Sequence, residues 1–273
     1  MGGPASRFLD EVRAQLDGMR STRYQHTTDV DAGSGTYFYD CSGLIEYALA
    51  RSVPDALRVL PTSSKARPLA VDIAWHLLRA PTHPGDPWLG LPTAAELRPG
   101  DLIAWVTPRG SRSRNTGHVM VVTAAPAPCP GRRDEWLVEI VDSTSTPHAV
   151  DSRRDGRTGL GSGTVGLVVD SEGRPTAYRW RGAESPNAPR TLVALGRLRD
   201  VGGRDMGGRD MGGRDVGGRD VGGPDVGGRD DGATGTEGIG VRGGRADRRC
   251  WARRIRALHS RPGPVTGSTA PPW

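Results

Sequence analysis

The sequence has 273 residues but little lysine, phenylalanine or cysteine. Lys65 is its one lysine, and arginine supplies the remaining positive charge, a bias typical of GC-rich genomes that favours a bacterial origin. Cys41, Cys129 and Cys250 are odd in number and far apart, which excludes a disulfide framework and a Cys-x-x-Cys metal site. No apolar run reaches the roughly 18–20 residues that cross a bilayer.

The N-terminus also lacks the apolar core of a signal peptide, since Met1–Met19 alternates charged with apolar residues. We therefore expect a cytoplasmic protein, or one exported to the cell envelope if translation starts elsewhere. Residues 1–200 carry 24 Lys and Arg against 22 Asp and Glu, whereas residues 201–273 carry 13 against 9. The near-neutral charge of residues 1–200 gives no indication that this part of the chain binds nucleic acid.

Apolar residues at helical spacing predict helices over about 5–19, from Cys41 to about Arg51, and over 68–79. Short apolar or alternating runs, bounded by turn residues, then predict six strands. These are 102–106, 118–123, 136–141, 165–169, 176–180 and 191–195. Helices followed by strands indicate an α+β domain over 1–200, with helices packed on an antiparallel sheet of about five or six strands.

The chain beyond this domain changes character. Residues 201–244 repeat a Val/Met-Gly-Gly-Arg-Asp unit that has too little apolar surface to bury a core, which predicts disorder. Residues 245–273 form a basic tail in which Trp251, Ile255 and Leu258 separate arginines. This tail is expected to form a short helix that touches an acidic surface, or else to be solvated without a partner.

The stretch Asp40–Tyr47, Asp-Cys-Ser-Gly-Leu-Ile-Glu-Tyr, places Cys41 at the start of a core-facing helix. Asp40 is a good N-cap, and backbone N–H groups at a helix N-terminus favour negative charge. We therefore expect a lowered pKa for the Cys41 thiol and a role as nucleophile. The alternative is a small buried apolar residue.

A histidine and an aspartate complete a candidate catalytic group. His118 opens the strand of the stretch Gly-His-Val-Met-Val-Val, and an imidazole there could accept the thiol proton. Asp142 ends the next strand, where its carboxylate could orient the imidazole. His148, a few residues later, is a rival for this third position.

Three motifs in this order resemble those of the NlpC/P60 family of papain-like cysteine peptidases. They are Asp-Cys-Ser-Gly-Leu-Ile at 40–45, Leu-Arg-Pro-Gly-Asp-Leu-Ile at 97–103 and Gly-His-Val at 117–119. Many members cut amide bonds in bacterial cell-wall peptides. The resemblance covers about Tyr24 to Asp142. The sequence departs from it at 25–27, where a Trp-Gly-Gly type loop is common, and in a long insertion over about 51–96.

The resemblance implies that Cys41 is the nucleophile, His118 the general base and Asp142 the third catalytic residue. It also implies three substrate-binding residues: Tyr24, which lines the site, and Asp40 and Ser42, at positions where the family contacts a free amine of the substrate.

The sequence thus predicts a cysteine peptidase or amidase that forms an acyl-enzyme on Cys41 and needs no metal or organic cofactor. Its expected substrate is a peptide, including one derived from peptidoglycan, and we expect a monomer. The alternatives are an acyltransferase on the same fold and a catalytically silent module that binds a peptide or glycan.

Overall fold

A computed structural model describes residues 2–63, 66–80, 85–108, 110–111, 115–154 and 156–199, all within one compact unit. The expectations for 201–244 and 245–273 lie outside the described residues. Within them, no helix has the length and apolar character needed to cross a membrane.

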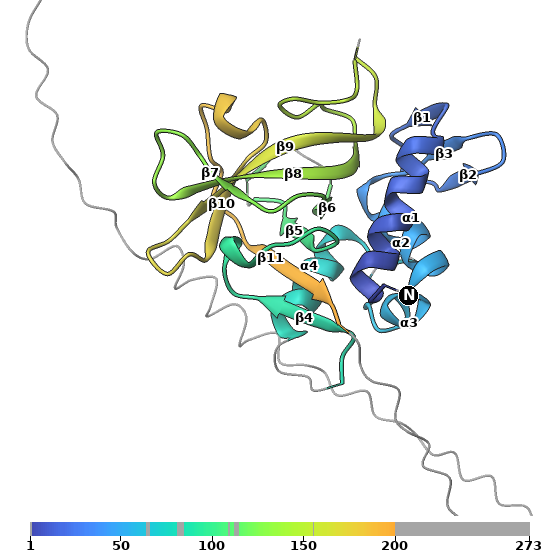
Figure 1. Cartoon of the computed structure of the whole chain (residues 1–273), viewed down its shortest axis with the longest axis horizontal. Coiled ribbons are helices and arrows are strands. Elements are labelled where there is room, and N and C mark those ends of the chain that lie inside the picture. The colour runs from blue at the N-terminus through green and yellow to red at the C-terminus, as the bar shows by residue number, and fades with distance from the viewer. Residues whose placement is uncertain are drawn as a thin grey trace, which may run out of the picture. The chain divides into compact units, whose positions relative to one another are not determined.

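The described part is α+β, as predicted (Figure 1). Its helices are α1 Pro4–Gly18, α2 Cys41–Ser52, α3 Pro54–Arg58 and α4 Ala70–Arg79, with short 3-10 turns at Ala94–Glu96 and Gly182–Glu184. Its strands are β1 Ser21–Arg23, β2 Asp29–Asp31, β3 Thr36–Phe38, β4 Trp88–Leu91, β5 Leu102–Val106, β6 Gly117–Val122, β7 Ala127–Pro128, β8 Glu135–Thr144, β9 Gly159–Val169, β10 Pro175–Arg179 and β11 Val193–Leu198.

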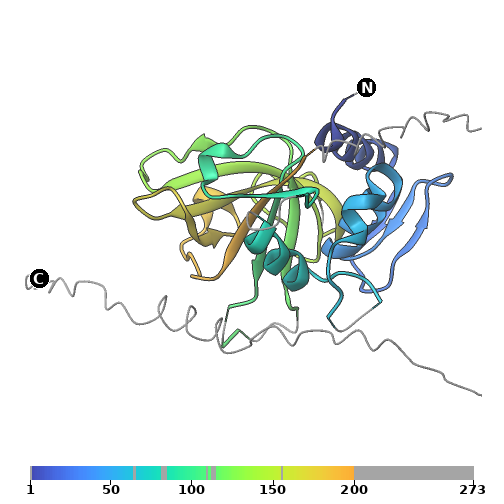
Figure 2. The same cartoon turned by 90° about the horizontal axis from the view of Figure 1, so that it is seen from below.

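Most of the strands belong to one antiparallel sheet. Among the described residues this sheet has eight strands in the order β10-β9-β8-β6-β5-β11-β4, with β7 paired to β8. The prediction of five or six strands was too low because β4 and β7 are short and carry no alternation of their own. An isolated bridge between Ala177 and Arg190 links β10 to the segment before β11, so the sheet curls on itself (Figure 2).

The segments 20–39 and 81–92 have no helical or alternating apolar pattern, so their sequence predicts loops, but both contain regular structure. The segment 20–39 holds a small sheet of order β1-β3-β2, and the segment 81–92 holds β4. Strands of three or four residues depend on their partners, so local sequence does not reveal them. Pro54 follows the Cys41 helix, where a proline predicts a break in the helical structure. It instead begins α3, because proline suits the first turn of a helix.

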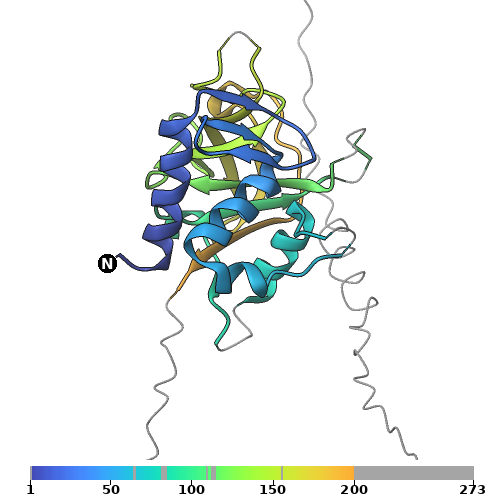
Figure 3. The ribbon, with the colours of Figure 1, turned by 90° about the vertical axis from the view of Figure 1, so that its right-hand side faces the viewer.

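The large sheet separates two apolar cores. Side chains alternate between the faces of β6, so Val119 and Val121 pack against the helices while Met120 and Val122 face the second core. Figures 1 and 3 show α1 and α2 side by side next to the sheet, and α4 packs on β5, β6 and β11. Residues at the start of β6 can therefore reach α2 from one side and the second core from the other.

The strands β6 and β8 separate near the helix that carries the cysteine. They pair at two positions, Val121 with Val141 and Val122 with Ile140, and the pairing does not continue to His118. Helix α2 packs against both strands. This separation lets the N-terminus of α2 approach side chains from the start of β6 and the end of β8.

Candidate active site

Helix α2 begins at Cys41 because Asp40 caps it. Asp40 Oδ1 accepts a hydrogen bond of 2.8 Å from the Gly43 N–H, and the Asp40 carbonyl oxygen accepts one from Leu44. The cap leaves the N–H groups of Cys41 and Ser42 for other partners. Cys41 itself is 4% exposed and belongs to the core between helices and sheet. The predicted start of this helix is confirmed.

Burial raises the pKa of the Cys41 thiol to about 12, and the negative charges of Asp40 and Asp142 add to the rise. The N–H groups of Val119 and Ser42, which donate to the sulfur, oppose it. The expectation of a lowered pKa is therefore wrong for this structure, because desolvation outweighs the helix N-terminus. At neutral pH the resting group is a thiol, and a base must remove its proton before it attacks.

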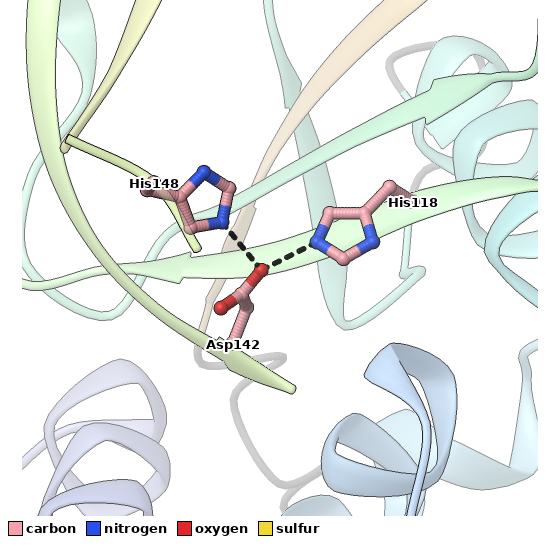
Figure 4. A group of neighbouring side chains, drawn as sticks. All are labelled: His118, Asp142 and His148. Carbon is pink, nitrogen blue, oxygen red and sulfur yellow. Dashed lines mark hydrogen bonds and ion pairs between the residues drawn. The ribbon is translucent and has the colours of Figure 1, made fainter. Parts of the chain in front are cut away.

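His118 lies at the start of β6 with its ring against Asp142. Its Nε2 lies 2.5 Å from Asp142 Oδ2 (Figure 4). Burial lowers the pKa of His118, and the hydrogen bond and charge of Asp142 oppose this effect. Since Nε2 donates its hydrogen to a carboxylate, a neutral ring carries its lone pair on Nδ1. This is the protonation state that a general base needs.

No hydrogen bond joins Cys41 Sγ to a ring nitrogen of His118, although both residues are described. The sulfur instead accepts from the N–H of Val119, the residue that follows His118. The sulfur therefore contacts the residue that follows the base, and the side chains must rearrange before the thiol can transfer its proton to His118. Such contacts commonly tighten when substrate binds.

Asp142 holds two imidazoles and a guanidinium. Its Oδ2 accepts from His118 Nε2 and, at 2.8 Å, from His148 Nε2, while Arg153 Nη2 lies 2.9 Å from Oδ1. Burial favours the protonated acid, but the charge of His148 and the hydrogen bonds from both rings hold the Asp142 pKa well below its usual range. Asp142 therefore contacts His118 directly, as predicted, whereas Nε2 of the alternative residue, His148, bonds to Asp142 rather than to His118.

Tyr24 lies near enough to Cys41 for the charges of the two groups to interact. Burial raises its pKa, and the nearby Cys41 and Asp40 raise it further. A hydrogen bond from the Asn115 side chain and the charge of Arg67 oppose the rise. The phenol therefore stays protonated, and its O–H can serve as a donor.

Asp40 and Ser42 face an arginine that sequence reasoning did not identify. Arg67, from the insertion, donates at 2.7 Å to Asp40 Oδ2 and at 2.7 Å to Ser42 Oγ. Asp40 Oδ2 also lies 3.1 Å from His26 Nδ1. Two of the three residues expected to bind substrate, Asp40 and Ser42, are therefore paired within the protein. No local signal in the sequence relates position 67 to position 40.

The group formed by His118, Asp142 and His148 contains residue types that bind metals, and its ligand atoms lie within 4.8 Å of one another. The geometry does not suit a cation, however. Both imidazole Nε2 atoms point at one carboxylate oxygen, and the Arg153 guanidinium already neutralises the carboxylate. The three side chains bind one another, and a cation at this place would have to displace these contacts.

Comparison with known proteins gives little that bears on this arrangement. The chain is 28% identical over 158 residues to an uncharacterized protein of Acanthamoeba polyphaga mimivirus, in a match that covers 52% of this chain and 67% of the viral protein. No family model and no solved structure matches the chain.

Proposed function

We propose that this protein is a cysteine-dependent hydrolase of amide bonds, with Cys41 as nucleophile, His118 as general base and Asp142 as the residue that orients the base. One observation carries the proposal. The Asp142 carboxylate holds His118 Nε2 at 2.5 Å, and the Cys41 sulfur lies against the backbone N–H of the next residue in β6. This arrangement supports the proposal, because covalent catalysis requires a nucleophile, a base and a group that orients the base.

The reaction starts from a neutral thiol and a neutral imidazole. As Cys41 Sγ attacks the carbonyl carbon, its proton passes to His118 Nδ1 and a C–S bond forms. The C–N bond then breaks, and His118 returns the proton to the leaving nitrogen. Water then attacks the resulting thioester while His118 accepts a proton from it. The C–S bond breaks, the acid is released, and His118 returns the proton to the Cys41 sulfur, which restores the thiol. Asp142 stabilises the imidazolium in both steps.

The oxyanion formed in each step would lie at the N-terminus of α2. The N–H of Cys41, which the Asp40 cap does not use, and the O–H of Tyr24 are the donors that we assign to it. Loss of one such donor typically lowers the rate by about 100- to 1,000-fold.

The substrate that we propose is a peptide or isopeptide, with cell-wall peptides as the first class to test, because the three motifs resemble those of NlpC/P60 peptidases. Arg67 distinguishes this site. A substrate ammonium group could reach Asp40 only if it displaced the guanidinium that lies 2.7 Å from the carboxylate. Substrates without a free amine at this position are therefore favoured.

Acyl transfer on the same residues is the second candidate function. Cys41 is 4% and His118 7% exposed, so little water reaches the reacting groups. A thioester that is shielded from water could pass its acyl group to an amine or an alcohol instead. The same acyl-enzyme would form, and the acceptor would decide the product.

Detection of the acyl-enzyme tests the proposal. The full chain is incubated with cell-wall peptides, quenched in acid and digested, and Cys41 is examined by mass spectrometry for an added acyl group. We expect the adduct on Cys41 and none in Cys41→Ala, whereas Cys129→Ala, which removes the second buried cysteine of the described residues, should behave as wild type. Addition of an amine as acyl acceptor to the same reaction distinguishes acyl transfer from hydrolysis. Peptide binding without an adduct would instead indicate a silent module.

A further inference from the structure

His148 is enclosed and faces an acceptor at each ring nitrogen. Its side chain has no exposed surface. Nδ1 lies 2.9 Å from the backbone carbonyl oxygen of Trp180, and Nε2 lies 2.8 Å from Asp142 Oδ2. The Trp180 ring covers the imidazole at a centroid distance of 4.1 Å. A backbone carbonyl oxygen can only accept a hydrogen bond, so Nδ1 must carry a hydrogen.

The partner of Nε2 is also an acceptor. Asp142 is a carboxylate because the guanidinium of Arg153 lies 2.9 Å from its second oxygen, Oδ1, and His118 Nε2 lies 2.5 Å from Oδ2. A carboxylate has no hydrogen to donate, so Nε2 of His148 must carry one as well. The ring that fits between these two acceptors is the doubly protonated imidazolium.

Charge balance favours the same state. Asp151 contacts Arg153 Nε at 2.8 Å and accepts the backbone N–H of His148 at 2.7 Å. The buried cluster therefore contains two carboxylates, Asp142 and Asp151, and needs two cations to be neutral. Arg153 is one cation, and a protonated His148 is the other. His118, at the edge of the cluster, is then free to be neutral.

We propose that His148 is a buried imidazolium that positions Asp142 for His118, an inference that rests on the proposed function for its catalytic meaning. His148 holds Asp142 Oδ2 by a hydrogen bond, and the Arg153 guanidinium forms an ion pair with Oδ1, so that Oδ2 receives the N–H of His118 and Nδ1 of His118 keeps its lone pair. His148 contacts neither Cys41 nor a substrate atom in this scheme. It is a positioning residue that acts through Asp142.

The imidazolium also changes the basicity of His118. The two rings lie 6.3 Å apart between centroids, and the charge of His148 lowers the pKa of His118, as does that of Arg153. The groups that face the two rings are Asp142 from β8, Asp151 and Arg153 from the following loop, and Cys41 from α2. Of these, the carboxylate of Asp142 acts in the opposite direction and raises the pKa of His118.

Nitrogen-detected NMR of the histidine rings of the full wild-type chain tests the protonation state without a substrate. At pH 7 we expect both nitrogens of His148 to be protonated and His118 to carry its hydrogen on Nε2 alone. Signals are assigned by loss in His148→Gln and His118→Gln. A singly protonated His148 at pH 7 overturns the proposal.

The second measurement follows the rate at which iodoacetamide alkylates Cys41 as a function of pH. In His148→Gln the positive charge is gone, so the acid limb of this profile should move up by about one pH unit. His76→Gln, which removes another histidine paired to an aspartate, should leave the limb in place. If folded His148→Gln has an acid limb at the same pH as wild type or at lower pH, the proposal is contradicted. An unreactive Cys41 in wild type instead contradicts the proposed function, whatever the state of His148.

Discussion

Arg67 Nη2 lies 2.7 Å from Asp40 Oδ2, so the carboxylate that caps the helix of the candidate nucleophile is already paired with a guanidinium. The side chains of Arg67 and Asp40 are 11% and 7% exposed. Arg67 comes from the insertion that separates this sequence from the NlpC/P60 pattern. The pair therefore places a feature specific to this chain next to Cys41.

Removal of Arg67 should destabilise the protein. In Arg67→Met the Asp40 carboxylate loses its charged partner while it remains largely buried, which costs about 1.5–3 kcal/mol. Urea unfolding monitored by tryptophan fluorescence measures the loss. Arg58→Met is the matched control, because Arg58 forms an exposed pair with Asp55 and should change stability by less than about 1 kcal/mol. Equal losses of stability in the two variants would show that the Arg67–Asp40 pair stabilises the protein no more than an exposed ion pair does.

Alkylation of Cys41 should depend on His118. Since burial raises the Cys41 pKa to about 12, the thiol needs a base, and we expect His118→Ala to slow its reaction with iodoacetamide at least tenfold. Cys129, also buried, should react more slowly than Cys41 in wild type because no described imidazole contacts it. Peptide mapping by mass spectrometry follows both sites. Equal alkylation rates in wild type and His118→Ala would show that His118 does not act as the base for Cys41.

Substitution of Asp142 should affect both activity and stability. Asp142→Ala should lower kcat by roughly 10- to 10,000-fold, the upper end being the cost of losing the orienting carboxylate in a serine triad. Asp142→Asn should destabilise by about 3–5 kcal/mol, because it leaves the Arg153 and His148 cations with one fewer buried negative charge. Kinetics and urea unfolding at pH 7 measure the two effects.

The same carboxylate predicts a pH dependence of stability. The folded-state pKa of Asp142 lies below its unfolded value of about 3.9, so its contribution is complete above pH 4–5 and is lost as the pH falls towards the folded-state pKa. Unfolding free energies measured from pH 6 to pH 3 should fall more steeply for wild type than for Asp142→Asn. Parallel curves would show that Asp142 does not titrate in this way.

Backbone strain lies next to the buried cluster. Val150 has φ of 47°, in a region that β-branched residues avoid, and its side chain extends into solvent. Val150→Asn should stabilise by about 1 kcal/mol, since asparagine tolerates this conformation and little packing is lost. Val59→Asn, at an exposed valine with φ of −88°, is the control and should gain nothing. Thermal unfolding of both variants tests whether the turn between His148 and Asp151 is strained.

Local sequence by itself determined the elements whose signals lie within a few residues. Asp40 caps α2, β5 spans Leu102–Val106 as expected, and the turn residues between Val169 and Pro175 join β9 to β10. These features depend on capping, alternation and turn chemistry, which neighbouring residues supply. The meeting of His118 with Asp142 was also predictable, because successive antiparallel strands lie side by side.

Tertiary structure decided what depends on distant partners. The strands β1–β4 are too short to show a period and exist because a neighbouring strand pairs with them. Residues far apart in sequence set the environment of the site, as the pairing of Arg67 with Asp40 shows. The sequence-based prediction of a lowered Cys41 pKa was wrong because it considered only the helix N-terminus, which is a local effect. Desolvation, which raises the pKa, depends on everything packed around the sulfur.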